Sequence, residues 1–386
     1  MERSDLSAEL TRRAMLKRAG IGAGVLALPG ILAACGDDED SSSGSDSSGG
    51  SASSGPAGED PELTKLLDAI TSDSVIVATY GGSTEAARKA AFWDSFTERT
   101  NVKVITPDIT GTLGDDQLNG KVKPRWDSFH ASSYQVLFSL KTGKKPLVKV
   151  PIAEDLTPDY AKDYMWQSFL VGYVAASLKG TFDTPAATPA DFFDLKKFPG
   201  KRAWPTNFYI DGTKEWALLA DGVEPDALYP LDLERANAKI SSIWDDLVFY
   251  EAYPQIQTFL TSKTVAMAWG PSGIFTALPK KGAEVDIIWD KLVTSWNNES
   301  IIPGAPNEDA AIALSAWCTD PARQAKFCEA TNYGPPSQAA FEKMPEAVRT
   351  QLPNSEGREP VALDDEFYRD NYDKMYEDNQ QLFESH

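Results

Sequence analysis

The chain alternates short apolar runs, typical of strands, with longer stretches whose apolar residues recur at helical spacing. The run Val75–Thr79 predicts a strand, and the glycine pair that follows Tyr80 predicts a tight turn. Ser83 suits the N-cap of a helix over 84–99, and Val102–Ile105 predicts the next strand. A strand, a turn, a helix and a second strand predict an α/β fold whose neighbouring strands pair in parallel.

The same alternation continues toward the C-terminus, and the globular body is expected to begin near Ser72. Further helices are predicted at 216–221, 233–247, 256–261, 308–319, 322–331 and 365–383, and further strands near Ala203 and at 248–250, 265–269 and 285–289.

Three tryptophans lie near the ends of predicted strands between Thr264 and Pro303: Trp269, Trp289 and Trp296. Loops carried on a rigid sheet are where ligands usually bind, so these indoles are candidates for the wall of a cleft. Packing in the core is the alternative for any one of them.

Composition and charge exclude several classes of function. With 386 residues, 42% of them hydrophobic, the chain is long enough for two lobes. A formal net charge of -20 argues against binding nucleic acid through a basic surface. The two histidines, His130 and His386, exclude a multi-histidine metal site, and no glycine-rich nucleotide motif is present. Neither a metal nor a cofactor is therefore expected.

The N-terminus has the pattern of an export signal. Basic residues at 11–18, among them Arg12 and Arg13, precede the apolar run 19–34, which is too short to span a membrane. The arginine pair resembles a twin-arginine signal, and the sequence LAAC ending at Cys35 resembles a bacterial lipobox. We therefore expect a signal peptide over 1–34, a lipid anchor on Cys35 and a flexible Ser/Gly/Asp-rich tether over 35–72.

Two further cysteines, Cys318 and Cys328, lie in predicted helices joined at Asp320-Pro321. Outside the cytoplasm such a pair could be oxidised. Sequence leaves a disulfide and two buried free thiols as equal alternatives, because geometry decides between them.

Several blocks in fixed order resemble the substrate-binding proteins of ABC importers, in particular the spermidine/putrescine-like group. The resemblance covers most of residues 73–386 and rests on the following segments: VIVATYGGSTEAARKAAFWDSFTERTNVKV, DLKKFPGKRAW, ALLADGVEPDALYPLDLERA, VAMAWGPSG, VDIIW, SWNNESIIPGAPNEDAA and NYGPPSQAAF.

The resemblance implies a type II periplasmic-binding-protein fold: two α/β lobes, each a mixed sheet flanked by helices, joined by two crossovers around a ligand cleft. It places lobe 1 at 73–173 plus 298–340 and lobe 2 at 174–297 plus 341–386, with crossovers near Gly172–Ser177 and Trp296–Ser300. The protein would be a monomer without enzymatic activity on the outer face of the cytoplasmic membrane. Its partners would be a small solute, an ABC permease and a cytoplasmic ATPase.

The resemblance also implies a ligand site made of an aromatic box with carboxylates at the amino groups of a polyamine such as putrescine or spermidine. The aromatic positions fall on Tyr80, Tyr134, Trp269, Trp296 and Tyr333. The acidic positions transfer less well: one falls on Asn298, the expected pair on Tyr209 and Gly212 with Asp211 beside them, and Glu251 is a further candidate. Ser83 and Ser133 complete the expected set.

Three alternatives remain open from the sequence. The same family could bind a neutral or acidic solute through the aromatics with Asn298, Ser132 and Ser133. A secreted hydrolase could use the acid pair Asp127 and Glu299, although a chain with 57 acidic residues forms many accidental pairs. An interaction module could use the acidic surface itself.

Overall fold

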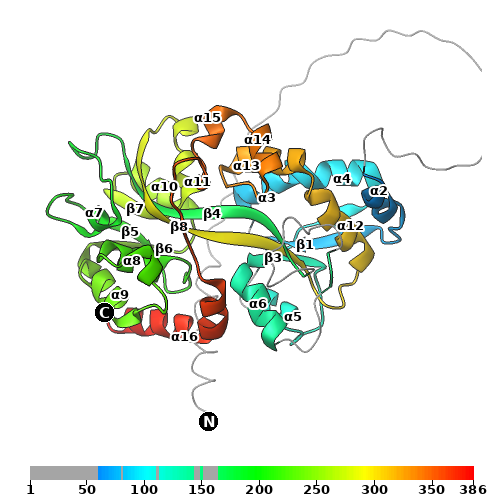
Figure 1. Ribbon diagram of the computed structural model, residues 1–386, viewed down its shortest axis with the longest axis horizontal. Helices are drawn as coiled ribbons and strands as arrows, with labels where there is room; N and C mark the ends of the chain where they lie inside the picture. Colours follow the sequence, from blue (N-terminus) through cyan, green and yellow to red (C-terminus); the bar gives the residue numbers. More distant parts are fainter. Residues whose placement is uncertain (1–59, 80, 110–112, 143–147, 151–163) are drawn as a thin grey trace, which may run out of the picture. The chain divides into compact units, whose positions relative to one another are not determined.

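A computed structural model describes residues 60–79, 81–109, 113–142, 148–150 and 164–386. Its nine strands form one mixed sheet in the order β2-β1-β3-β8-β4-β7-β5-β6, and β9 (Val361–Ala362) pairs with β8. Two long strands at the centre of this order, β4 (Trp166–Leu178) and β8 (Val285–Ile301), run antiparallel to each other, as Figure 1 shows.

One half of the sheet is built from the N-terminal part of the chain. β1 (Ser74–Ala78) pairs in parallel with β2 (Lys103–Ile105) and with β3 (Ser128–Ser132), and β3 pairs antiparallel with the end of β8. The parallel pairing of β1 with β2 confirms the first α/β unit predicted from the sequence. The helices of this half are α2 (Pro61–Asp68), α3 (Gly82–Arg88), α4 (Asp94–Thr100), α5 (Leu113–Leu118), α6 (Ser133–Thr142), α12 (Glu308–Cys318) and α13 (Pro321–Thr331).

The other half has the same plan. β5 (Arg202–Pro205) lies between β6 (Leu247–Tyr250) and β7 (Met267–Pro271), parallel to both, and β7 pairs antiparallel with the end of β4. Parallel strands joined to an antiparallel crossover strand in each half confirm the predicted two-lobe α/β fold. Its helices are α7 (Pro189–Phe193), α8 (Thr213–Ala220), α9 (Leu233–Ser241), α10 (Pro254–Thr261) and α11 (Ser272–Thr276).

The C-terminal segment adds helices α14 (Gln338–Lys343), α15 (Glu346–Arg349) and α16 (Asp365–Glu384). α16 begins at an Asp364 N-cap and packs against α6, while hydrogen bonds join it to the loop before α8. It has non-helical φ and ψ angles at Asn371. α16 therefore links a helix of the first half with the loop that carries Asp211 in the second.

Several predicted boundaries were wrong. The predicted tether 35–72 includes α2, whose Leu63 and Leu67 are buried and whose start is capped by Asp60. The helix predicted after the first strand, α3, begins at Gly82 with Gly81 as its N-cap, so Ser83 is not the cap. A π-helical segment, Lys89–Trp93, follows it.

The helix predicted over 233–247 ends at Ser241, and the predicted short strand at 285–289 is the start of β8, which runs seventeen residues. The predicted signal peptide, Cys35 and the tether up to residue 59 lie outside the described residues. Among the described residues, no helix has the length and apolar character needed to cross a membrane.

Candidate functional site

Asp211 is the point where segments from both halves of the sheet converge. The Tyr134 hydroxyl, at the start of α6, donates to Asp211 Oδ1 at 2.6 Å, and the Tyr173 hydroxyl, on β4, donates to Oδ2 at 3.2 Å. Ser132, the last residue of β3, is a third hydrogen-bond partner of the same carboxylate. A partly buried carboxylate thus lies among three hydroxyl groups.

Burial raises the pKa of Asp211, and the hydrogen bonds from Tyr134, Tyr173 and Ser132 act in the opposite direction. Burial, and secondly the negative charge of Asp211, hold the pKa values of Tyr134 and Tyr173 well above their usual range. Within the described part of the chain, no lysine, arginine or histidine forms an ion pair with Asp211. The site therefore holds a negative charge that protein cations do not neutralise.

The backbone at Gly212 explains why the loop can lie so close to β4 and β7. Its φ is +73°, and a Cβ at this position would lie 3.2 Å from Val293, 3.4 Å from Tyr173 and 3.5 Å from Trp269. Glycine adopts a positive φ without the steric cost of a side chain. Gly212 therefore sets the approach of Asp211 to Tyr173 and contributes no side chain of its own.

The three tryptophans differ in their exposure and contacts. Trp269 is only 1% exposed and stacks on Tyr173, with ring centroids 5.3 Å apart and planes 10° apart. It packs directly against Tyr173, and its role in a ligand site stays a prediction. Trp296 is partly exposed, whereas the Trp289 ring lies under the Arg358 guanidinium at 3.4 Å.

Asn298 is fully buried beside the start of α6. Its amide nitrogen donates to Ser133 Oγ at 2.9 Å and to the Trp296 carbonyl at 3.1 Å. Its Oδ1 has no hydrogen-bond partner among the residues that the structure describes. The structure thus brings Asn298 and Ser133 together as predicted, and it leaves one buried acceptor atom beside them.

The remaining predicted residues are more scattered. Tyr333 stacks on Phe169 at 4.8 Å, and burial raises the pKa of its hydroxyl to about 12. The Tyr209 hydroxyl donates to the backbone carbonyl of Glu251, and Glu251 itself is exposed. The Glu251 carboxylate is therefore not part of the Asp211 cluster. Tyr80 lies outside the described residues, and only the backbone of Ser83, in α3, is described.

Sequence reasoning missed Tyr173 and Tyr253. Tyr173 bonds Asp211 directly, and Tyr253, at the start of α10, shares a hydrogen bond with Tyr173. A hydroxyl in the otherwise apolar run around Tyr173 was the available signal. The hydroxyl alone does not predict that Asp211 is its partner, because the contact depends on how β4 lies against the loop before α8.

The acid pair considered for hydrolysis serves structural roles. Asp127 accepts hydrogen bonds from the backbone of Ile76 and from the backbone and side chain of Asn307. Glu299 forms a buried ion pair with Arg88. Both carboxylates are thus engaged by the fold. No group of three or more His, Cys, Asp or Glu side chains that could hold a metal ion occurs in the described ranges.

Cys318 and Cys328 are two free, buried thiols. Of the two alternatives that the sequence leaves open, the structure therefore has the unbonded pair.

A family model described as bacterial extracellular solute-binding protein matches residues 91–352, well over half of the chain. The chain belongs to this family. The solute-binding protein is accordingly the substrate-binding component of an ABC importer for a small solute, and it acts outside the cytoplasm. Its relatives bind solutes and are not enzymes.

Individual relatives are similar over most of the solute-binding protein. A γ-aminobutyric acid (GABA)-binding protein of Pseudomonas aeruginosa is 27% identical over 79% of this chain and 89% of its own. The solved Atu4243-GABA receptor is 27% identical, with a TM-score of 0.73 over 80% of this chain and 97% of its own. An ABC transporter substrate-binding protein from Bradyrhizobium japonicum is 25% identical, with a TM-score of 0.71; the match covers 80% of this chain and 99% of that protein.

Proposed function

We propose that this solute-binding protein captures a small solute with one ammonium group, an ω-amino acid of the GABA type, and delivers it to its permease. Asp211 carries the proposal, because it is a partly buried carboxylate whose partners among the described residues are hydroxyl groups and not cations. A ligand ammonium would supply the missing positive charge. Charge-assisted hydrogen bonds of this kind are about twice as strong as neutral ones.

The polyamine predicted from the sequence fits these residues less well. A diamine calls for an acceptor of negative charge at each end, because a desolvated ammonium left without one is costly. Of the other predicted acidic positions, one is the neutral Asn298, and Glu251 is exposed and outside the cluster. The side chains of Asn298 and Ser133 are neutral and would leave a second ammonium without a negative partner. Two similar proteins named for GABA favour the same choice.

The test is thermal unfolding of the purified protein with GABA, putrescine and spermidine, followed by calorimetric titration of any ligand that shifts the transition. A ligand at 100 times its dissociation constant should add about 2.7 kcal/mol to the free energy of unfolding. We expect a shift with GABA. A shift with putrescine or spermidine alone would restore the polyamine assignment, and no shift with any amine would overturn the ammonium ligand.

We also propose the N-terminal organisation and the lobe boundaries given above as properties of this chain. A lipid on Cys35 would hold the body near the membrane through its tether. Membrane fractionation tests this, because Cys35→Ser should release the protein, while Cys318→Ser should leave it bound.

Hinge closure between lobe 1 and lobe 2 should shrink the radius of gyration in small-angle scattering when the ligand is added.

A further inference from the structure

Glu215, a buried carboxyl group, lies four residues after the Asp211 anchor. Its side chain on α8 is fully buried. The Tyr229 hydroxyl lies 2.7 Å from Glu215 Oε1, and the Tyr368 hydroxyl of α16 lies 2.9 Å and 3.0 Å from the two carboxyl oxygens. The ring of Tyr368 packs on the ring of Tyr134, with centroids 5.2 Å apart. Glu215 is therefore linked through Tyr368 to the tyrosine that bonds Asp211.

The contacts around Glu215 need one more proton than an ionised carboxylate allows. The Tyr229 hydroxyl accepts from the Asp364 backbone and donates its proton to Glu215. The Tyr368 hydroxyl has a single proton, yet it lies near both Glu215 oxygens and also 3.2 Å from the carbonyl of Ile210. If Glu215 carries a proton, it donates to Tyr368, and Tyr368 donates to Ile210. The bonds Tyr229–Glu215, Glu215–Tyr368 and Tyr368–Ile210 are then complete, whereas an ionised Glu215 would take the Tyr368 proton and leave the Ile210 carbonyl without it.

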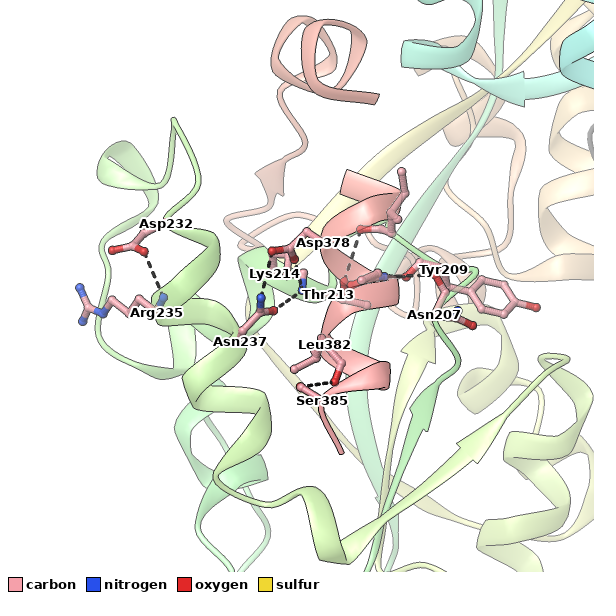
Figure 2. Close-up of polar contacts among 12 residues, drawn as sticks. Asn207, Tyr209, Thr213, Lys214, Asp232, Arg235, Asn237, Asp378, Leu382 and Ser385 are labelled. Atoms are coloured by element: carbon pink, nitrogen blue, oxygen red, sulfur yellow. Dashed lines mark hydrogen bonds and ion pairs between the residues drawn. The ribbon is translucent and has the colours of Figure 1, made fainter. Parts of the chain in front are cut away.

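The negative charge of Asp211 favours the same state, whereas the ammonium of Lys214 favours an ionised Glu215. Lys214, the next residue, is fully buried, but it pairs with Asp378 at 2.7 Å and donates to Asn237, as Figure 2 shows. Burial raises the pKa of Glu215 to about 7, the hydrogen bonds from Tyr229, from its own backbone N–H and from Tyr368 oppose this, and the charge of Asp211 adds to the rise. The charged side chains of the neighbouring helices form surface ion pairs: Asp191 with Lys197, and Arg235 and Lys239 with Asp221.

We infer that Glu215 is a neutral, proton-carrying group behind the Asp211 anchor, and that it gives up part of this proton when an ammonium ligand binds. The first half stands on the geometry of the ligand-free protein. The second half rests on the proposed function, because it needs a cation at Asp211. That cation would cancel the negative charge that helps to hold the proton on Glu215.

The first experiment tests the proton in the absence of ligand. Unfolding constants are measured at pH 5 and pH 7.5 for the wild type, Glu215→Gln and the exposed control Glu234→Gln. An amide can replace the neutral acid, since it also donates to Tyr368 and accepts from Tyr229. The ratio of the wild-type to the Glu215→Gln unfolding constant should therefore rise about 50-fold between the two pH values, for a pKa moving from 4.5 to about 7. The inference is overturned if this ratio stays constant between the two pH values. It is also overturned if the ratio of the wild-type to the Glu234→Gln unfolding constant rises by the same factor.

The second experiment tests the coupling to ligand. GABA is titrated calorimetrically at pH 7 into the full-length protein in phosphate and in Tris, whose ionisation enthalpies differ. The wild type should release a few tenths of a proton per GABA, and Glu215→Gln should release less. GABA binding without this difference overturns the coupling and leaves the proposed function standing. If GABA does not bind, the coupling falls together with the proposed function, while the first experiment still decides whether Glu215 carries a proton.

Discussion

The Tyr134 hydroxyl and the Asp211 carboxylate form a 2.6 Å hydrogen bond across 77 residues of sequence. Tyr134 follows β3 at the start of α6, whereas Asp211 precedes α8, so the bond joins the two halves of the sheet. A contact of this kind exists only when the two halves are close together. It connects the residue that we propose as ligand anchor to the closing movement expected of a two-lobe binding protein.

The first prediction concerns the charge of the anchor. Asp211→Asn should reduce affinity for GABA at least 30-fold, because truncating one side of a buried charge pair costs about 2–5 kcal/mol. The exposed acid Glu251 is the matched control, and Glu251→Gln should bind as the wild type does. Calorimetric titration measures both. Equal losses in the two variants would contradict the assignment of Asp211.

The second prediction concerns the hydroxyl groups that hold Asp211. Tyr134→Phe removes one hydrogen bond and keeps the ring that packs on Tyr368, so affinity should fall about 5- to 10-fold, the value of roughly one net hydrogen bond. Tyr173→Phe should have a similar or smaller effect, because its bond is longer, 3.2 Å. Tyr164, whose ring lies beside Lys149 and which is not a partner of Asp211, provides the control as Tyr164→Phe. If both variants bind GABA with unchanged affinity, the ligand does not bind at the Asp211 cluster.

The third prediction concerns the buried ion pair between Arg88 and Glu299, whose side chains are 4% and 7% exposed. Arg88→Met should lower the free energy of unfolding by about 3–5 kcal/mol, because Glu299 would remain buried without its partner. The double variant Arg88→Met with Glu299→Gln should regain part of this loss, since it removes both charges. Urea unfolding measures all the variants. A double variant less stable than the single one would contradict this explanation.

The sequence allowed the α/β alternation to be predicted because strand and helix periods are local properties. β1, β2 and α10 lie close to their predicted positions, and the parallel pairing follows from the length of the connection. The stacking of Trp269 on Tyr173 could not be predicted, because neighbouring strands come from distant parts of the chain. The convergence of Tyr134 and Tyr173 on Asp211 could not be predicted, for it depends on where β3 and β4 lie relative to the loop before α8.

The last prediction concerns Cys318 and Cys328. Burial raises the pKa values of both thiols, and neutral, buried thiols react slowly because the thiolate is the nucleophile. In a Cys35→Ser background, an aromatic disulfide reagent at pH 8 should therefore label neither thiol in the native protein and both in guanidinium chloride. A disulfide would leave none to label in guanidinium until a reductant is added. Rapid labelling of one thiol in the native protein would contradict the buried position of that residue.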